Sequence, residues 1–291
     1  MNKNIFNWLI FIALAVIWGS SFILMKIGLD NNLSAFQVAS IRIVASGIII
    51  LPVAINSFKI IPGNKWGYVF LSGLFGNLLP AYLFCIAEEG IDSSLAGTLN
   101  SLTPVFVIIT GTLFFRLKAS KNNIIGISIA FAGSFLLLLS KGHMKENQHL
   151  ILISMVVLAT FFYGYNVNMV AKNLSEMGSL QIASVGLLLN AVPALGVLIF
   201  TGYFNNNFSD KNILTGTGAA AVLGILGTAV ASIIFYMLVK RAGRIFASMV
   251  TYGIPFVAIG WGILYGDQYG FKQIICLTII LLGVYYSNKK N

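Results

Sequence analysis

Charged residues are scarce in this 291-residue chain, where Asp, Glu, Lys and Arg together make up only 9%. An ordinary soluble domain carries about 25%. Hydrophobic residues make up 58% of the chain, and its mean hydropathy is +0.89. A soluble domain of this size lacks the polar surface needed to cover so much apolar material. The composition therefore argues against a soluble enzyme, a nucleic-acid-binding domain or a disordered protein, and indicates a chain whose solvent is the lipid bilayer.

Groups that carry hydrolytic, redox or metal chemistry are also few. No Asp, Glu or His is expected inside an apolar run, and the two cysteines, Cys85 and Cys276, lie in separate runs, so no disulfide framework is indicated. No phosphate-binding loop is followed by Lys-Ser/Thr, which leaves ATP hydrolysis unsupported. His143 and His149 share one loop with Glu146, and a solvated loop is favoured there over a metal site. We therefore predict no enzyme activity, no cofactor and no metal.

What the chain has instead is a series of ten apolar runs joined by short polar breaks. A membrane-spanning helix needs about 20 apolar residues, so ten helices consume nearly the whole length. The first run is longer than a signal-peptide core, which predicts a retained helix. The predicted fold is an all-α integral membrane protein with ten transmembrane helices. The runs cover residues 5–27, 34–56, 66–87, 94–115, 122–140, 149–171, 179–203, 217–239, 246–266 and 271–287.

The two halves of the chain resemble each other. At a shift of 151 residues, Gly73 falls on Gly224 and Pro104 falls on Pro255, with further matches in the same order. Each half holds five runs, and because five is odd, the second half must enter the membrane in the opposite sense. This pattern predicts an inverted-topology repeat, the architecture of many secondary transporters. The predicted units are residues 1–140, a linker loop at 141–148, and residues 149–291.

The basic residues give the predicted topology an orientation. If both termini are cytoplasmic and ten helices alternate, most of the 18 Lys and Arg residues fall on the inner side. Most of the eight acidic residues fall on the outer side, with Glu176 as the exception. Cytoplasmic loops of membrane proteins carry an excess of Lys and Arg. We therefore predict a multi-pass protein of the cytoplasmic membrane with both termini in the cytoplasm.

Two prolines at repeat-related positions lie near the middle of the fourth and ninth runs. Pro104 and Pro255 each remove a helical hydrogen bond, which frees the carbonyls of Asn100 and Thr251. Such carbonyls are tolerated at membrane depth where they line a cavity or contact protein. We favour a pair of broken helices that act as hinges beside a cavity, while a simple packing kink stays open.

Aromatic and hydroxyl side chains meet at mid-depth in the first run, at Trp18-Gly19-Ser20-Ser21-Phe22, and in its counterpart at residues 162–166. They are too deep for an interfacial belt and fit either a binding site or close helix packing. Arg42 is the one charged residue predicted to lie clearly inside a span. It fits an anion contact, an outer gate partner for Asp30 or Glu88, or a side chain that snorkels to the headgroups.

These motifs give the chain a family resemblance. The helix-1 motif at residues 18–22, Arg42, and Ser94-Leu95-Ala96-Gly97-Thr98-Leu99-Asn100-Ser101-Leu102-Thr103-Pro104 together resemble the EamA-type transporters of the drug/metabolite transporter superfamily. The resemblance implies an inner-membrane permease with a central cavity between the halves, often an exporter of amino acids or other metabolites. The cavity residues that it implies here are Trp18, Ser21, Tyr82, Asn100, Tyr163 and Tyr252.

We predict a secondary transporter that moves small organic metabolites such as amino acids by alternating access. The family resemblance favours export over import. A channel or facilitator for small polar solutes stays open as an alternative, and an intramembrane enzyme is less favoured. The expected partners are a small-molecule substrate and the lipid bilayer, with no nucleic acid. The sequence leaves monomer and homodimer both open.

Overall fold

The computed structural model describes residues 3–91, 93–140, 150–264 and 270–289, and the elements in these ranges are helices only. The predicted all-α fold is therefore confirmed. The predicted linker at 141–148, together with His143 and His149, lies outside the described residues. The helices of the first half are α1 (Lys3–Asp30), α2 (Ala35–Phe58), η1 (Gly63–Lys65), α3 (Trp66–Gly73), η2 (Leu74–Leu78), α4 (Leu79–Glu88), α5 (Ser93–Asn100), α6 (Thr103–Phe115) and α7 (Lys121–Ser140).

The second half repeats this order with the same kinds of interruption. Its helices are α8 (Leu150–Asn173), α9 (Ser179–Phe200), η3 (Tyr203–Asn205), α10 (Lys211–Val222), η4 (Leu223–Val230), α11 (Ala231–Ala242), α12 (Arg244–Ser248), η5 (Met249–Gly253), α13 (Ile254–Leu264) and α14 (Phe271–Asn288).

Nine helical segments of the described chain are long and apolar enough to cross a bilayer. A shorter apolar helix at Lys121–Leu137 occupies the place of the fifth expected span. The bundle exposes large apolar side chains, with Leu113 at 70%, Val192 at 69% and Ile48 at 66%. Soluble proteins rarely expose apolar surface on this scale, whereas lipid tails solvate it. The chain is thus a multi-pass membrane protein, and the count of ten spans stays a prediction.

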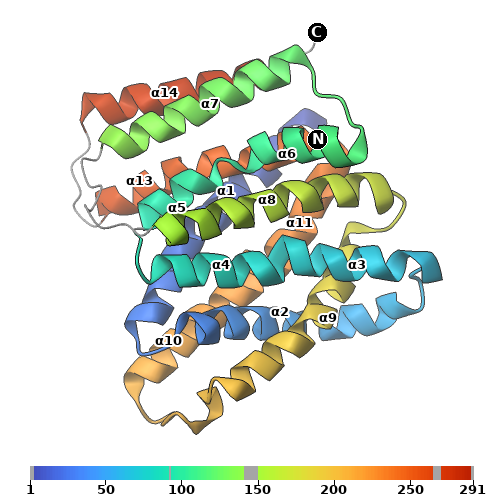
Figure 1. Cartoon of the computed structure of the whole chain (residues 1–291), viewed down its shortest axis with the longest axis vertical. Coiled ribbons are helices and arrows are strands. Elements are labelled where there is room, and N and C mark those ends of the chain that lie inside the picture. The colour runs from blue at the N-terminus through green and yellow to red at the C-terminus, as the bar shows by residue number, and fades with distance from the viewer. Residues whose placement is uncertain (1–2, 92, 141–149, 265–269, 290–291) are drawn as a thin grey trace.

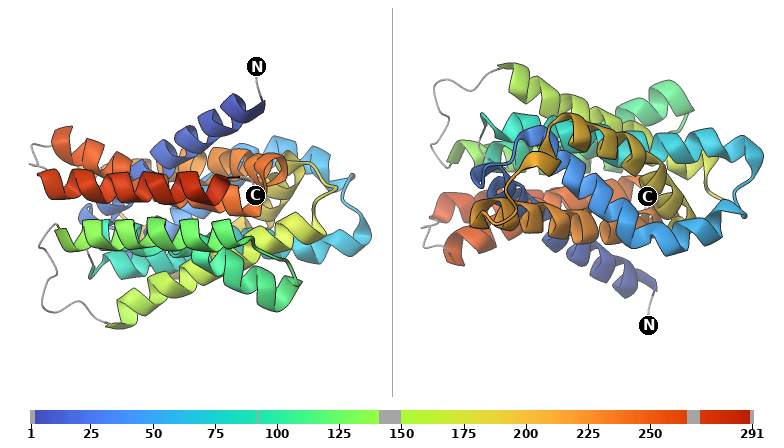
Figure 2. Two further views of the ribbon diagram at one scale, coloured as in Figure 1. Left: turned by 90° about the horizontal axis from the view of Figure 1, so that it is seen from above. Right: turned by 90° about the horizontal axis from the view of Figure 1, so that it is seen from below.

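Helices of each half pack mainly against helices of the other half. The second spans of the two halves, α2 and α9, lie side by side at one edge of the bundle, and the last spans, α7 and α14, lie together at the other (Figure 1). The first helix α1 packs against α10, α11 and α13 of the other half, and α8 packs against α3, α4 and α6. The axes of most helices are roughly aligned, and the N-terminal helix α1 crosses them obliquely (Figure 2). Each half therefore completes the other, and the centre of the bundle is built from both.

The α7–α14 pair shows how closely these helices approach. A side chain at Gly126 would collide with the backbone of Gly283 and Ser287, and one at Gly283 would collide with the backbone of Gly126 and Ala130. Small residues let helix backbones come this close in a membrane, where dispersion contacts replace the hydrophobic effect as the force between helices. The close contact of Gly126 with Gly283 thus holds the fifth spans of the two halves against each other.

The fourth and ninth spans are interrupted, and the interruptions are in register. Pro104 is the second residue of α6, after a turn at residues 101–102, and Pro255 is the second residue of α13, after the 3₁₀ segment η5. Proline is tolerated in the first turn of a helix because the backbone N–H that it lacks has no helical partner there. The prolines therefore start a new helix after a break, rather than bending a continuous one. The third and eighth spans carry matching π-helical segments, η2 and η4.

Candidate functional site

A cavity lies at the centre of the bundle, where these interruptions meet. Its volume is about 80 Å³, measured as space for the centres of water-sized molecules. By that measure one water needs about 10–15 Å³, so the cavity has room for several waters or part of a small solute. Both halves line it: Trp18, Ser21, Phe22, Met25, Arg42, Gly76, Asn77, Phe84, Asn100 and Thr103 from the first, and Tyr163, Asn166, Val167, Gly227, Ser232, Phe235, Tyr236, Ser248 and Thr251 from the second.

The interrupted spans position the lining. Asn100 ends α5 and Thr103 begins α6, so the break in this span faces the cavity. In the other half Ser248 ends α12, and Thr251 in η5 is the repeat counterpart of Asn100. Gly227 belongs to the π segment η4, and its carbonyl accepts a hydrogen bond of 3.1 Å from the Trp18 indole N–H. Irregular backbone is tolerated at membrane depth only where protein or water satisfies its polar groups. The Trp18 indole satisfies one carbonyl of η4, and the same hydrogen bond fixes the Trp18 side chain at the cavity wall.

Aromatic rings form an apolar wall that crosses from one half to the other. The ring centroids of Trp18 and Phe235 are 5.1 Å apart, those of Phe22 and Phe84 are 6.0 Å apart, and those of Phe84 and Tyr163 are 6.2 Å apart. Binding pockets for small molecules combine such apolar walls with a few placed polar groups. The wall can therefore hold the apolar part of an organic solute.

Amides and hydroxyls supply the polar groups. The Ser232 hydroxyl donates to the Asn77 side-chain oxygen at 3.0 Å, and Thr103 donates to the Asn100 side-chain oxygen at 3.2 Å. The Asn166 amide donates to the Tyr236 hydroxyl at 3.2 Å, while its own Oδ1 is buried without a hydrogen-bond partner among the described residues. An unsatisfied buried acceptor costs free energy, so its presence beside a cavity marks a place where another donor is accommodated.

Arg42 brings the one formal charge to the cavity lining. It is 8% exposed, and its Nε donates to the Thr228 hydroxyl at 2.7 Å. Among the described residues, no carboxylate lies within ion-pair distance of the guanidinium, since the ion pair found there joins Lys26 and Asp30. The snorkelling alternative does not describe this geometry, because the side chain is buried in the bundle interior.

The cavity brings together five of the residues that the sequence singles out: Trp18, Ser21, Asn100, Tyr163 and Arg42. Two others lie outside its lining. The Tyr82 hydroxyl is hydrogen-bonded to the Ser40 hydroxyl at 2.7 Å. Tyr252 is fully buried, and its hydroxyl donates to the Ile127 carbonyl at 3.0 Å.

Several lining residues were missed by sequence reasoning, among them Tyr236, Ser232 and Met25. For Phe84 and Phe235 a signal existed, because they match each other at the 151-residue shift. Asn166 lies at the end of the helix-6 motif that matches helix 1. Repeat-related pairs were thus a better guide to the lining than polarity at mid-depth.

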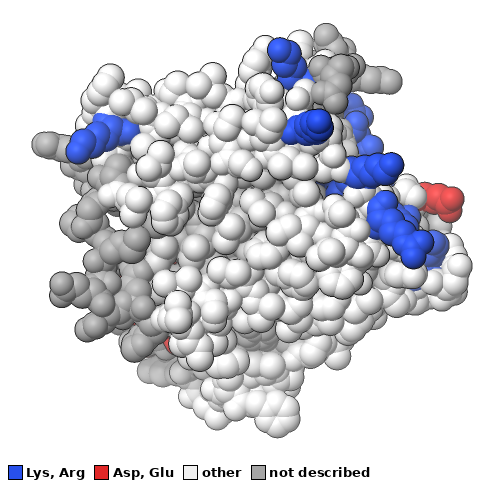
Figure 3. Space-filling view, turned by 45° about the horizontal axis from the view of Figure 1, so that its top comes forward, with Lys and Arg blue, Asp and Glu red and all other residues white. Residues whose placement is uncertain are grey.

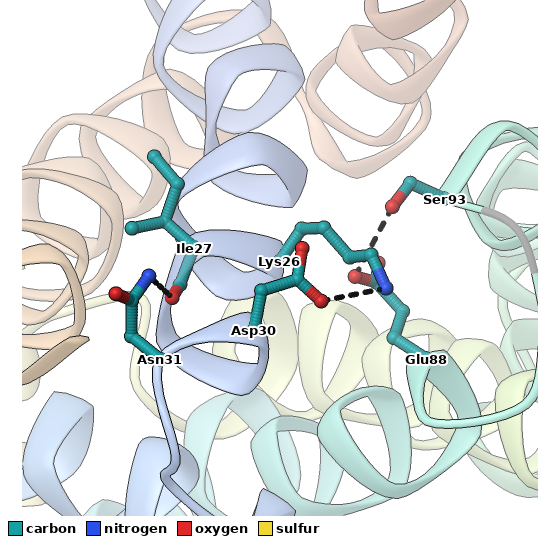
Figure 4. Close-up of polar contacts among 6 residues, drawn as sticks. All are labelled: Lys26, Ile27, Asp30, Asn31, Glu88 and Ser93. Atoms are coloured by element: carbon teal, nitrogen blue, oxygen red, sulfur yellow. Dashed lines mark hydrogen bonds and ion pairs between the residues drawn. The ribbon is translucent and has the colours of Figure 1, made fainter. Parts of the chain in front are cut away.

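One end of the bundle, which we call the Glu88 end, holds a buried acid. Glu88 is 2% exposed and is the last residue of the span Gly63–Glu88, so the expectation that no acid lies within a span is wrong at this position. The helix α4 continues one residue past the apolar run. This brings the Glu88 carboxylate within hydrogen-bond distance of Ser93 at the start of α5. Its Oε2 accepts a hydrogen bond of 3.3 Å from Ser93, while its Oε1 has no partner among the described residues (Figure 4). Lys26 and Asp30 form an exposed ion pair of 3.1 Å beside it.

The opposite end, which we call the Arg244 end, is held by a charge-assisted network. One guanidinium nitrogen of Arg244 donates to the Asn168 side-chain oxygen at 2.8 Å and to the Val107 carbonyl at 3.4 Å, and the other donates to the Lys118 carbonyl at 2.9 Å. The Asn168 amide donates in turn to the Val107 carbonyl at 2.8 Å and to the Thr110 hydroxyl at 2.9 Å. This network ties α12 to α6 and α8.

The described residues contain no group of three or more His, Cys, Asp or Glu side chains that could hold a metal ion. The two cysteines are free and buried. The groups that line the cavity are rings, amides, hydroxyls and one guanidinium.

Comparison with known proteins gives this site a context. A model of the EamA-like transporter family matches residues 6–139 and 150–289, one segment in each half. An uncharacterized transporter of Archaeoglobus fulgidus is 24% identical over 288 residues, covering 98% of this chain and 99% of the relative. The uncharacterized inner membrane transporter YedA of Escherichia coli K12 is also 24% identical, covering 94% of this chain and 85% of the relative. A solved crystal structure shares the fold with a TM-score of 0.70 at 13% identity, covering 96% of this chain and 95% of that one.

Proposed function

The chain belongs to the EamA-like transporter family and is a membrane transporter, and from this premise we propose that it exports small organic metabolites, such as amino acids, across the cytoplasmic membrane by alternating access. The observation that supports this proposal most is the central cavity, because the interrupted spans of both halves line it at repeat-related positions. Inverted repeats with a site at their interface are a common design of secondary transporters. The inference from repeat to mechanism is one of analogy between folds.

Substrate recognition in this proposal divides between two kinds of surface. The rings of Trp18, Phe235 and Tyr163 hold the apolar part of the solute, and Asn100 and Ser21 hydrogen-bond its polar part. A pocket of this kind fixes orientation with few polar groups while burial supplies most of the affinity. The family membership and the lack of a described metal-binding cluster favour a transporter over an enzyme.

Access to the cavity is proposed to alternate as the halves exchange their arrangements. The breaks before Pro104 and Pro255 are the proposed hinges, because they are interruptions at which the backbone can change direction without breaking a continuous helix. The Glu88 end and the Arg244 end are then the two gates. Two related halves can each adopt the other's conformation, so the repeat provides two states of related structure.

The proposed orientation places the Arg244 end in the cytoplasm with both termini. The start of α1 and the end of α14 lie toward this end of the bundle (Figure 1), and Arg241 there donates to Asn7. Lys and Arg side chains gather toward one end of the face drawn in Figure 3. Cytoplasmic ends carry this excess of positive charge. Reporter fusions after residue 289 and in the loop after Phe200 should report the cytoplasm and the outer side of the membrane respectively, and the reverse would overturn the orientation.

Transport itself is tested in two stages. Metabolites in the medium of cells with and without the protein identify a candidate solute, and proteoliposomes then measure its counterflow. Trp18→Ala and Asn100→Ala should each reduce flux at least about tenfold, since each removes a contact in a desolvated pocket worth about 1.5 kcal/mol or more.

Two controls match these variants outside the cavity. Trp8 is 40% exposed and packs on Phe246, and Asn212 is exposed at the start of α10, so Trp8→Ala and Asn212→Ala should keep flux near the native level. Unchanged flux in both cavity variants would refute the site. Single-channel currents from the reconstituted protein would refute a carrier mechanism and favour the channel.

A further inference from the structure

Arg42 is a buried cation without a contact counter-ion among the described residues. It is 8% exposed, and the ion pair found in the described chain is between two other residues, Lys26 and Asp30. A charged side chain inside a membrane span costs at least about 2.5–3.5 kcal/mol, so it is kept where it meets a partner or a function. Arginine does not lose its charge in proteins, so protonation chemistry does not remove this cost.

The guanidinium is only partly engaged. It has five N–H donors, and the one on Nε is used by the Thr228 hydroxyl at 2.7 Å. The four N–H donors on the two terminal nitrogens have no hydrogen-bond partner among the described residues, and Arg42 lines the cavity. Thr228 belongs to η4 of the opposite half, so a contact across the repeat interface fixes the direction of the side chain. Thr228 therefore fixes the direction of the guanidinium, and the N–H donors on its two terminal nitrogens, which we call the fork, are free to bind a ligand in the cavity.

The nearby acids do not occupy this fork. Glu88 accepts its hydrogen bond from Ser93, and Glu89 accepts one of 3.0 Å from the backbone N–H of Ala35 at the start of α2. Asp30 is paired with Lys26 on the exposed side of α1. Each acid of the Glu88 end therefore has a different described partner, and the guanidinium stays open on the cavity side.

We propose that Arg42 is the binding site for the carboxylate group of the transported solute, which makes the substrates small monocarboxylates or zwitterions with an apolar body. A guanidinium fork matches the two oxygens of a carboxylate. Arg42 is the one charged residue in the lining, so a single negative charge is neutralised and a dianion is not. The aromatic wall that includes Trp18 and Phe84 takes the rest of the molecule. This proposal rests on the transport function proposed above and names the substrate class of that site.

The test compares each carboxylate with the amide that lacks its negative charge. The purified full-length chain in nanodiscs is titrated with two matched pairs, phenylacetate against phenylacetamide and L-leucine against L-leucinamide, with binding read by Trp fluorescence and by calorimetry. We expect the native protein to bind the carboxylate of at least one pair about tenfold or more tightly than the amide, the size of one charge-assisted hydrogen-bond contact.

The variants separate charge from geometry. Arg42→Gln should bring the carboxylate-to-amide ratio close to one while amide binding persists, which also shows that the variant is folded. Arg42→Lys should recover part of the ratio, because a lysine keeps the charge but lacks the fork. Lys26→Gln removes an exposed cation outside the cavity lining and should keep the native ratio. A native protein without preference for either carboxylate, or Arg42→Gln with the native ratio, would overturn the proposal.

Failure of this inference is distinguishable from failure of the proposed function. If proteoliposomes with the native protein release a neutral or cationic solute faster than empty liposomes and carboxylates are not moved, the transporter stands and the carboxylate site falls. If no solute moves faster than from empty liposomes, the transport function itself falls. If carboxylates move and Arg42→Gln stops them at unchanged expression, both stand.

Discussion

The Glu88 end and the Arg244 end of the bundle occupy repeat-related places in the fold, yet they are held very differently. Ser93 begins α5 and Arg244 begins α12, and these positions are 151 residues apart. Ser93 makes one long hydrogen bond of 3.3 Å to Glu88, whose other oxygen is unpaired among the described residues. Arg244 makes three hydrogen bonds that join three helices. The repeat therefore fixes where the ends are, and individual side chains decide how firmly each is held.

This difference bears on the proposed alternation. Hydrogen bonds to charged groups are worth about 1.5–3 kcal/mol each, more than neutral ones. Arg244 alone supplies three such hydrogen bonds at its end of the bundle, while at the Glu88 end the two neighbouring acids accept one each, Glu88 from Ser93 and Glu89 from the Ala35 backbone. We expect the two states of the transporter to differ in free energy for this reason, even though the halves are related.

The largest effect is expected when the Arg244 end is weakened. Arg244→Ala removes three hydrogen bonds and leaves the Asn168 oxygen unpaired. A loss of about 1.5–3 kcal/mol shifts the balance between the states by about 10- to 100-fold toward opening of this end. Alkylation of a cysteine placed at Thr110 should accelerate by this factor. Arg241→Ala, which removes an exposed contact to Asn7, should leave the alkylation rate near the native value.

A smaller effect is expected when the Glu88 end is strengthened. Ser93→Arg places a guanidinium at the start of α5, within reach of the unpaired Glu88 oxygen. A new charge-assisted contact worth about 1 kcal/mol would slow the alkylation of a cysteine placed at the Glu88 end about fivefold. Both ends would then be held by an arginine. Ser93→Ala is the matched control and should speed labelling slightly. Faster labelling in Ser93→Arg would show that Glu88 is not available as a partner.

A smaller effect still is expected when the buried acid is replaced by an amide. Glu88→Gln keeps an oxygen that can accept from Ser93 and removes the ionisable group, so its transport rate should stay within about threefold of the native rate. Flux measured between pH 5.5 and 8.5 should then show whether Glu88 takes part in coupling. A loss of pH dependence in Glu88→Gln alone would assign a proton-carrying role to this residue.

The smallest effect is expected at the exposed ion pair. The side chains of Lys26 and Asp30 are 52% and 57% exposed, and exposed pairs contribute about 0–1 kcal/mol. Lys26→Gln should change flux less than about twofold, and the change should shrink further in high salt. A large loss of flux would mean that Lys26, rather than Glu88 with Ser93, controls the Glu88 end of the bundle.

Much of the fold could be predicted from the sequence, because it depends on local composition and on the repeat. Most apolar runs predict the helical spans to within a few residues, although the eighth span begins at Lys211, six residues before the predicted start at residue 217. The matched prolines predict where the fourth and ninth spans are interrupted. The form of the interruption could not be predicted, because a kink, a turn and a 3₁₀ segment leave the same proline in the sequence. The sequence places Glu88 outside the span because the apolar run ends at residue 87, whereas the helix α4 itself ends at Glu88.

The candidate site was only partly predictable, and the tyrosines show why. Tyr252 lies in η5, where a 3₁₀ segment has 3.0 residues per turn instead of 3.6, so the side chain turns away from the face that α-helical spacing would predict. Its hydroxyl reaches Ile127 and not the cavity. Tyr82 is turned toward Ser40 on the neighbouring helix α2. Tyr236 faces the cavity although nothing in its local sequence distinguishes it from the other two.

The sequence by itself determined the solvent of this protein, its helical spans and its duplication, because hydropathy and repeat matches are properties of the chain. Only the tertiary structure decided which side chains meet in the cavity and which charges stay unpaired. Arg42 and Thr228 are 186 residues apart, and their contact depends on the rotation and depth of two helices from different halves. Those quantities are set by packing across the whole bundle, and for that reason the free guanidinium fork could not be predicted from the sequence.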